Sequence, residues 1–396
     1  MKMNWGKRMD LVENPSLEAV LAVLGDSTVI SMAGGLPSQE SFPVKEMQES
    51  FTRTLDEVKG NALQYGATEG YMPLRQWIAG YMNSQDIECN EKNIMVTSGS
   101  QQGIELVARA LIEPGDRVVV ESPSYMAALQ VFKNEGAKII AAPSDHEGIM
   151  IEGLKELLEE VKPKFIYVIP TFQNPSGLTL GKERREKLIK IAQELEILIL
   201  EDNPYGELRY KGEAQAPLKS VAAPDEVIYL GTFSKIVAPG LRLGWMVTTP
   251  ENIKKLAALK QSSDLLSNQT SQIALFKFLE TGILPAHIER IKGLYKVKRD
   301  AMEEALKKHF PDGVTWTDAE GGMFVWATLP EGLDTMKMFP KAMAEKVAYV
   351  PGATFYPDGD DRGDRSMRLN FSGPTPEQIE EGIKRLGEVI RKEMGQ

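Results

Sequence analysis

A single lysine lies in a polar turn between two apolar runs, within residues 231–245. The runs 227–230 and 244–247 predict a strand on either side of an irregular turn. Three other polar side chains share the turn with Lys235: Thr232, Ser234 and Arg242. Burial and neighbouring cations lower the pKa of an amine, which suits a lysine to covalent imine chemistry. For Lys235 alone, a surface lysine in a loop is the simpler interpretation.

A second group of polar residues indicates an anion site. The Ser-Gly-Ser-Gln stretch at 98–101 lies between a predicted strand and the start of a helix predicted near Ser100, where unpaired N–H groups and the helix dipole favour an anion. Thr232, Ser234 and Arg242 could offer two hydroxyls and a guanidinium to the same anion. Serine caps on helices are common, so either group alone is weak support. Together they predict a phosphate site beside the lysine.

An acid and several ring-binding groups complete the pattern. Asp202 directly follows an apolar strand, where a buried carboxylate is costly unless it meets a cation such as a protonated pyridine nitrogen. An acid at that nitrogen makes pyridoxal phosphate an electron sink. Asn174 and Tyr205 can hydrogen-bond a ring hydroxyl, and Tyr125 offers an aromatic face for stacking. Taken singly, Asp202 is as well explained by helix capping, and Tyr125 by core packing.

The elements that must position these residues form a regular pattern from about 93 to 247. Short β-rich runs alternate with amphipathic helices, which predicts an α/β fold with a mostly parallel seven-stranded sheet. The predicted strands are 94–96, 118–120, 139–141, 165–169, 197–200, 227–230 and 245–247. The carboxyl ends of parallel strands share one edge, where open α/β folds bind ligands. The polar segments after these strands are therefore expected to converge on one crevice.

A chain of 396 residues exceeds the usual size of one core, so two packed domains are expected. Residues 1–45 are predicted as an N-terminal segment, with a helix at about 15–25 and a Gly-Pro loop, at the edge of the active site and the smaller domain. Residues 46–285 are predicted as the large domain. Residues 286–396 are predicted as a smaller α+β domain. Further helices are expected at about 250–262, 286–309 and 376–392, and further strands at 322–326 and 367–371.

Composition limits the possible functions. The net charge of -10 argues against a nucleic-acid partner, which needs a basic face. The single Cys89 rules out an intrachain disulfide framework and fits a reducing compartment. The sequence has no apolar run of signal-peptide type after its first ten residues and none long enough to span a membrane. A cytoplasmic protein without a membrane partner is expected, and no metal site is predicted.

Taken together, these motifs resemble those of fold-type I pyridoxal-phosphate enzymes of the class I/II aminotransferase family. The chain is similar in particular to the branch of 2-aminoadipate, aromatic and multi-substrate aminotransferases. The resemblance covers nearly the whole chain, from 33–37 to 368–371. Its most specific motifs, in this order, are Asn-Pro-Ser-Gly at 174–177, Asp-Asn-Pro-Tyr at 202–205, Ser-Lys at 234–235 and Pro-Gly-Leu-Arg-Leu-Gly-Trp at 239–245.

The resemblance implies a role for each residue type. Lys235 would form the imine with pyridoxal phosphate, the cofactor, and then move a proton to and from the substrate Cα. Asp202 would pair with the pyridine nitrogen, and Asn174 and Tyr205 would hold the ring oxygen. The implied phosphate cup is Ser100, Gln101, Thr232, Ser234 and Arg242. The implied contacts of the substrate α-carboxylate are Arg368, Asn174 and the backbone of Gly35.

The resemblance also implies a homodimer with shared active sites, in which Tyr65 reaches the phosphate of the other subunit. Ser122-Pro123 and Asn174-Pro175 are candidates for cis peptide bonds. In the first helix, relatives acting on acidic substrates often have an arginine where this chain offers Glu18. If Glu18 faces the pocket, it should disfavour a second substrate carboxylate.

The implied reaction moves the amino group of an α-amino acid to a 2-oxo acid, by default 2-oxoglutarate, in ping-pong fashion. The implied substrates are broad: aromatic, aliphatic or 2-aminoadipate-like amino acids. A pyridoxal-phosphate-dependent lyase is the alternative, since residue types alone do not fix which Cα bond breaks. A non-enzymatic sensor domain of a transcription regulator is a further alternative, against which the acidic charge argues.

Overall fold

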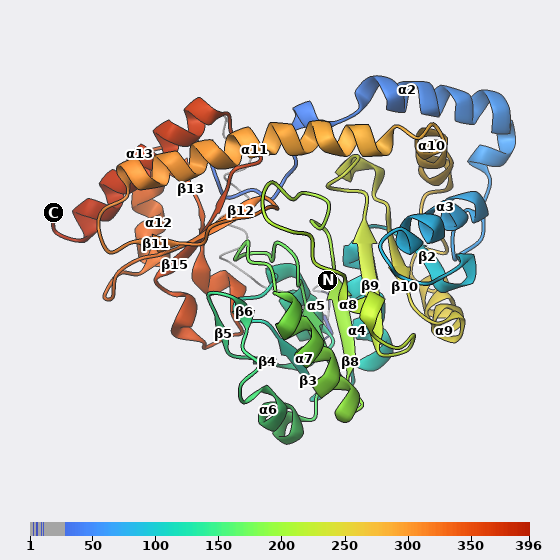
Figure 1. The fold of residues 1–396 in the computed structure, drawn as a ribbon, viewed down its shortest axis with the longest axis horizontal. Coiled ribbons are helices and arrows are strands. Elements are labelled where there is room, and N and C mark those ends of the chain that lie inside the picture. The colour runs from blue at the N-terminus through green and yellow to red at the C-terminus, as the bar shows by residue number, and fades with distance from the viewer. Residues whose placement is uncertain (1–2, 4, 7–8, 10, 12–27) are drawn as a thin grey trace.

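The computed structural model describes residues 3, 5–6, 9, 11 and 28–396. A large twisted sheet with helices on both sides lies in the lower part of Figure 1, and a smaller sheet with its own helices lies at upper left. The predicted helix at about 15–25, which contains Glu18, lies outside the described residues. Its position relative to the pocket therefore stays a prediction.

The large sheet has seven strands in the described part of the chain, in the order β2-β10-β9-β8-β7-β3-β4. The strands are β2 (Ile94–Thr97), β3 (Arg117–Val120), β4 (Lys138–Ala141), β7 (Phe165–Val168), β8 (Leu198–Asp202), β9 (Val227–Thr232) and β10 (Gly244–Val247). Among them only β10 runs antiparallel to its neighbours, β2 and β9. The predicted mostly parallel seven-stranded sheet is confirmed.

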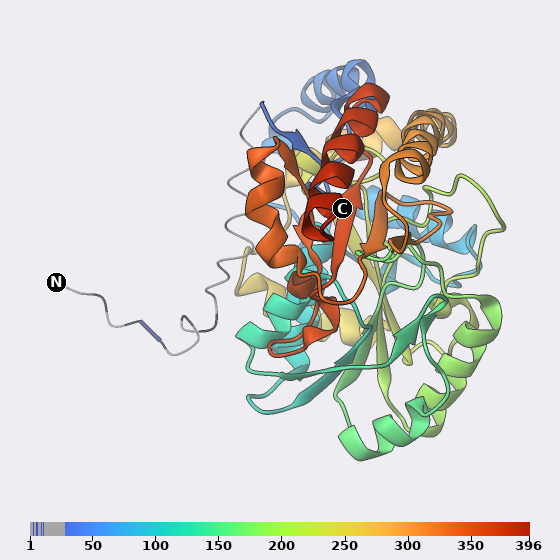
Figure 2. The same cartoon turned by 90° about the vertical axis from the view of Figure 1, so that its left-hand side faces the viewer.

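Both faces of the large sheet are covered (Figures 1 and 2). Val118 and Val120 of β3 belong to an apolar cluster with α4, α5 and α9, whereas Val119 points the other way into a cluster with α6, α7 and α8. This alternation follows from the two-residue period of a strand, and burial of both faces explains the continuous apolar runs. The elements are α4 (Ser100–Leu111), α5 (Met126–Asn134), α6 (Leu154–Val161), α7 (Lys182–Glu194), α8 (Leu218–Val221) and α9 (Pro250–Gln261), with a hairpin of β5 (Ser144–Asp145) and β6 (Gly148–Ile149).

A third cluster lies beside the β2–β10 edge of the sheet. It packs Met47, Leu74, Ile78 and Phe278 against Trp245 of β10. These residues come from α2 (Val44–Arg53), α3 (Met72–Asn83) and α10 (Gln269–Leu279); the turns between α2 and α3 are η3 (Thr54–Val58) and η4 (Lys59–Leu63). Pro73 lies in the first turn of α3, where its missing N–H costs nothing.

The smaller sheet has the strand order β11-β12-β15-β14. Its elements are α11 (Leu284–His309), β11 (Thr315–Trp316), β12 (Phe324–Thr328), α12 (Thr335–Ala344), β14 (Val350–Pro351), β15 (Ser366–Asn370) and α13 (Pro376–Glu393). β1 (Ile30–Ser31) pairs in parallel with β13 (Val347–Ala348), which joins the start of the described chain to this half. Val29, Met32 and Ala33 belong to the same apolar cluster as the residues of this half. This shared cluster supports our proposal that the chain divides into domains near residues 45 and 285. Neither α11 nor any other described helix is long and apolar enough to cross a membrane.

The helix α10 was not predicted. The structure buries this helix on most of its surface, and the sequence accordingly lacks a clear polar face. The buried residues are Gln272, Ile273, Ala274, Leu275, Phe278 and Leu279. A helix covered on most sides loses the 3.6-residue period by which a helix is recognised. The predicted helices 250–262, 286–309 and 376–392 agree with α9, α11 and α13 to within about two residues.

The turn that contains Lys235 connects β9 and β10, and these strands are closely packed where Gly231 of β9 faces Trp245 of β10. A Cβ atom on Gly231 would lie 2.2 Å from Cζ2 of Trp245, whose ring packs against Phe233 at a centroid distance of 4.7 Å. Gly231→Ala should therefore lower the midpoint of urea unfolding, at a cost of about 1–3 kcal/mol for overpacking. Gly240→Ala is the matched control, since its added Cβ meets nothing within 4 Å. Equal midpoints for the two variants would contradict this packing.

Candidate active site

The segments that follow β2, β3, β7, β8 and β9 meet at the carboxyl edge of the large sheet, as predicted. With Phe324 of β12 and Arg368 of β15 they line a cavity of about 320 Å³. The lining includes every predicted site residue except Tyr65: Gly35, Ser100, Gln101, Tyr125, Asn174, Asp202, Tyr205, Thr232, Ser234, Lys235, Arg242 and Arg368.

Lys235 lies in the turn after β9, and its amine points into this cavity. Its Nζ donates a hydrogen bond to the carbonyl oxygen of Gly35 at 2.9 Å. Burial, aided by the positive charges of Arg368 and Arg242, lowers the pKa of Lys235 to about 8. The uncharged fraction of the amine near neutral pH is therefore larger than for an ordinary lysine, and the uncharged form is the one that a nucleophile or proton acceptor requires.

Asp202 ends β8 and is 2% exposed. Its Oδ2 accepts a hydrogen bond from the Tyr167 hydroxyl at 2.9 Å, whereas its buried Oδ1 has no partner among the described residues. Burial raises the pKa of Asp202 to about 7, although the hydroxyls of Tyr167 and Ser100 act in the opposite direction. A buried carboxylate with one unpaired oxygen at a cavity wall fits a cationic N–H donor such as a protonated pyridine.

The opposite corner of the cavity is suited to an anion. Helix α4 begins at Ser100, and its first turn contains no acidic residue. Gly99 adopts φ +81°, and a Cβ there would lie 2.7 Å from Nη2 of Arg242, so only glycine lets the guanidinium come this close. Thr232 Oγ1 donates to Ser234 Oγ at 3.0 Å, which places both hydroxyls beside Lys235. N–H groups, hydroxyls and a guanidinium are the groups that bind phosphate.

Arg368 reaches the cavity from the smaller sheet and is 3% exposed. Its Nη1 donates to Oδ1 of Asn174 at 2.8 Å and its Nη2 to the carbonyl oxygen of Ala33 at 2.8 Å. Its guanidinium carbon lies 4.3 Å and 5.0 Å from the ring centroids of Phe324 and Phe355. Burial lowers the pKa of Arg368 to about 10, so it still carries its charge near neutral pH. No carboxylate pairs with it in the described structure, which suits it to an anionic ligand.

The remaining predicted residues hold the cavity walls. Tyr125 donates from its hydroxyl to Oε1 of Gln101 at 3.3 Å. The Ser122-Pro123 and Asn174-Pro175 bonds are both cis, as predicted. Tyr205 packs edge-to-face on Phe324 at 5.7 Å between ring centroids. Tyr65 lies away from the cavity with 77% of its surface exposed, so its contact with a second subunit stays a prediction.

Three contributors were missed by the sequence analysis: Tyr167, Phe324 and Phe355. Tyr167 had a usable signal, because a hydroxyl inside an otherwise apolar buried strand requires a hydrogen-bond partner. The two phenylalanines lie on segments distant in sequence, and nothing in their local pattern distinguishes them from core residues.

Comparison with known proteins decides the family. The sequence model described as "Aminotransferase class I and II" matches residues 28–386. The chain belongs to the class I and II aminotransferase family. It is 49% identical over 384 residues to aromatic-amino-acid aminotransferase 1 of Thermococcus litoralis, covering 96% of this chain and 92% of that one.

Two solved structures support the same assignment. A multiple substrate aminotransferase from Thermococcus profundus is 44% identical, with a TM-score of 0.94 and coverage of 99% and 98% of the two chains. The alpha-aminoadipate aminotransferase of Thermus thermophilus, complexed with N-(5'-phosphopyridoxyl)-L-leucine, is 36% identical, with a TM-score of 0.91 and the same coverage. The chain is therefore a pyridoxal-phosphate-dependent aminotransferase of fold type I, and the predicted family, fold, cofactor and reaction class are confirmed.

The charge state of Lys235 in the cofactor-free aminotransferase can be measured directly. Competitive labelling with acetic anhydride, read by mass spectrometry, should show the Lys235 peptide becoming reactive with an apparent pKa of about 8. In Arg368→Met the profile should move to higher pH, because removal of a nearby positive charge stabilises the ammonium form. Lys182, whose side chain is 82% exposed, is the internal reference for reagent concentration. A Lys235 profile that does not move in Arg368→Met would contradict the contribution assigned to the charge of Arg368.

Proposed function

We propose that this aminotransferase moves the amino group of an α-amino acid to 2-oxoglutarate, with Lys235 as the catalytic residue. Pyridoxal phosphate, when bound, supplies an electron sink that stabilises negative charge at the substrate Cα. The observation that carries the proposal is that one cavity holds the amine of Lys235, the half-paired carboxylate of Asp202 and the guanidinium of Arg368. Lys235 takes the proton from the substrate Cα in its uncharged form and returns it in the reverse step.

We assign the cofactor-holding role to the walls of this cavity. Asp202 would pair with the N–H of the pyridine ring, Asn174 and Tyr205 would hold the ring oxygen, and Tyr125 would offer its aromatic face to the ring. The phosphate is held by Ser100, Gln101, Thr232, Ser234 and Arg242. Arg242 has φ 51°, a strained conformation for a non-glycine residue, which supports a functional reason for its placement.

Arg368 is proposed to bind the substrate α-carboxylate as a bidentate fork. Its hydrogen bonds to Asn174 and Ala33 fix the guanidinium plane before substrate arrives, and Phe324 supports one face. Pre-ordering of this kind lowers the entropy lost on binding. Asn174 and the backbone of Gly35 assist at the same carboxylate.

The substrate side chain is proposed to be aromatic, aliphatic or 2-aminoadipate-like. The relatives named for aromatic amino acids, multiple substrates and alpha-aminoadipate support a broad range. The cavity wall includes Leu36, Met126 and Phe324, which favour apolar side chains. Met126 is unbranched and flexible, and so can adapt to different shapes.

We also propose a homodimer in which Tyr65 binds the phosphate in the partner subunit. Tyr65 belongs to a group of exposed apolar residues near η3, η4 and the start of α10: Leu55, Leu63, Tyr65, Met72 and Leu265. Thr270 donates to the carbonyl oxygen of Ala62 at 2.8 Å and so fixes the segment before Tyr65. Exposed apolar residues gathered in one region are typical of a subunit interface.

The single Cys89 supports the cytoplasm as the proposed compartment.

Lys235→Ala tests the proposed catalytic role. The variant should still bind pyridoxal phosphate but lose amino transfer by a factor of about 100 or more, because no other lysine in the described part of the chain lines the cavity. Formation of the 2-oxo acid from aromatic, aliphatic and 2-aminoadipate donors is measured with 2-oxoglutarate as acceptor. Lys182→Ala is the matched control on the surface. Turnover of Lys235→Ala near the wild-type rate would place the base elsewhere, and ammonia release without an acceptor would favour the lyase alternative.

The dimer proposal predicts activity in a hybrid of two defective chains. Lys235→Ala and Tyr65→Ala are co-expressed with different tags, and the hybrid is isolated on both. One of its sites then combines an intact Lys235 with an intact Tyr65 from the partner, so at low pyridoxal phosphate it should show about half of the wild-type activity. A hybrid of Lys235→Ala with wild type is the positive control. If Tyr65 serves its own subunit, the first hybrid will be as inactive as its parents.

A further inference from the structure

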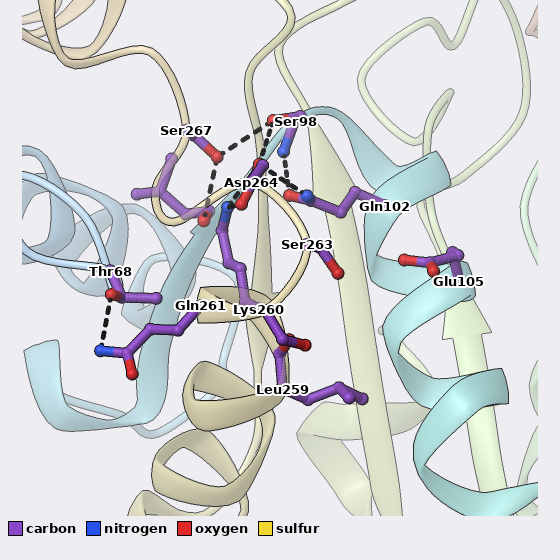
Figure 3. Close-up of polar contacts among 12 residues, drawn as sticks. Thr68, Ser98, Gln102, Glu105, Leu259, Lys260, Gln261, Ser263, Asp264 and Ser267 are labelled. Carbon is purple, nitrogen blue, oxygen red and sulfur yellow. Dashed lines mark hydrogen bonds and ion pairs between the residues drawn. The ribbon is translucent and has the colours of Figure 1, made fainter.

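Ser98 is the first residue after β2, and each of its three polar atoms makes a hydrogen bond. Its N–H donates to Oε1 of Gln102 at 2.8 Å, and its Oγ donates to Oδ2 of Asp264 at 3.2 Å (Figure 3). Its carbonyl oxygen accepts from Nη2 of Arg242 at 3.0 Å. The peptide that leads into α4 is therefore fixed by Arg242 on the side of the cavity and by Gln102 and Asp264 on the far side.

Asp264 connects the far-side contacts. Its Oδ2 also accepts from Nε2 of Gln102 at 2.7 Å, so one carboxylate oxygen holds both Ser98 and the residue that binds the N–H of Ser98. Lys260, one turn earlier in α9, donates to the two oxygens of Asp264 at 2.6 and 2.8 Å (Figure 3). The side chain of Lys260 is 0% exposed and that of Asp264 is 29% exposed. A buried ammonium needs a counter-charge, so Lys260 in turn fixes the carboxylate.

We propose that Asp264 is a positioning residue for the cofactor phosphate. Through Ser98 and Gln102 it sets the direction of the N–H groups at the start of α4 and the position of the Arg242 guanidinium. Asp264 does not line the cavity and so acts only through these neighbours. The inference rests on the phosphate cup of the proposed function and adds a residue that the cup itself does not contain.

The charge of Asp264 is part of this arrangement. Burial alone would raise the pKa of Asp264, but the hydrogen bonds from Lys260, Gln102 and Ser98 outweigh it and hold the pKa below its ordinary value. The carboxylate is therefore ionised near neutral pH and accepts strong, charge-assisted hydrogen bonds. The same helix contains an ion pair of the same spacing, Glu251 with Lys255, whose side chains are 76% and 72% exposed. That exposed pair is therefore a suitable control for the buried pair of Lys260 and Asp264.

The test compares two ligands that differ only in the phosphate group. In Asp264→Asn the dissociation constant for pyridoxal phosphate should rise about tenfold, because a charge-assisted network is lost. The dissociation constant for pyridoxal, which lacks the phosphate, should stay within about twofold of wild type. The ³¹P resonance of bound pyridoxal phosphate should shift, whereas kcat at saturating cofactor should change little.

Two further variants complete the test. Glu251→Gln should change none of these quantities. Gln102→Leu removes the link between the N–H of Ser98 and the carboxylate, and should reproduce the phosphate-selective loss even if Asp264→Asn does not fold. If the variants bind pyridoxal phosphate and pyridoxal equally more weakly than wild type, or bind pyridoxal phosphate as tightly as wild type, the inference is overturned. Asp264 is then a general structural residue. If wild type binds pyridoxal phosphate no more tightly than pyridoxal, the proposed phosphate cup itself is wrong, and this inference fails with it.

Discussion

The burial of unlike charges in one small cavity is the constraint on which this structure depends. Asp202 and Arg368 are 2% and 3% exposed, and among the described residues neither has an oppositely charged partner. Desolvation raises the pKa of Asp202 to about 7 and lowers that of Lys235 to about 8, so burial disfavours the charged form of each group relative to water. A ligand with a cationic ring nitrogen and anionic phosphate and carboxylate groups supplies the missing opposite charges.

The fold supplies these charges from separate directions. The lysine and the acid stand at the carboxyl ends of neighbouring parallel strands, β9 and β8, whereas Arg368 comes from the smaller sheet. The segment at 33–36 joins the two halves, because Arg368 binds the carbonyl oxygen of Ala33 and Lys235 that of Gly35. β1, just before this segment, pairs with β13 of the smaller half. The relative placement of the two halves therefore sets the distance between the amine of Lys235 and the guanidinium of Arg368.

The sequence was most informative where chemistry and topology agree. Apolar runs ending in polar turns predicted the strands, and the rule that parallel strands share a carboxyl edge predicted that Asp202 and Lys235 would meet. Contacts between segments distant in sequence could not be predicted. The contacts of Phe324 and Phe355 with Arg368 depend on how the smaller sheet packs on the rest of the protein, and no local sequence pattern encodes that packing. Helix α10 was missed because a helix buried on most sides loses its period. Asp264 had no motif, since its importance depends on Ser98 and Gln102, far away in sequence.

We propose above all that burial holds Asp202 ready to pair with a protonated ring nitrogen. The ¹⁵N chemical shift of ¹⁵N-labelled pyridoxal phosphate bound to the protein measures the protonation of that nitrogen directly. At pH 8 the wild-type complex is expected to show a protonated pyridinium, and Asp202→Asn an unprotonated pyridine. An unprotonated nitrogen in the wild type, or the same shift in both proteins, would contradict the account.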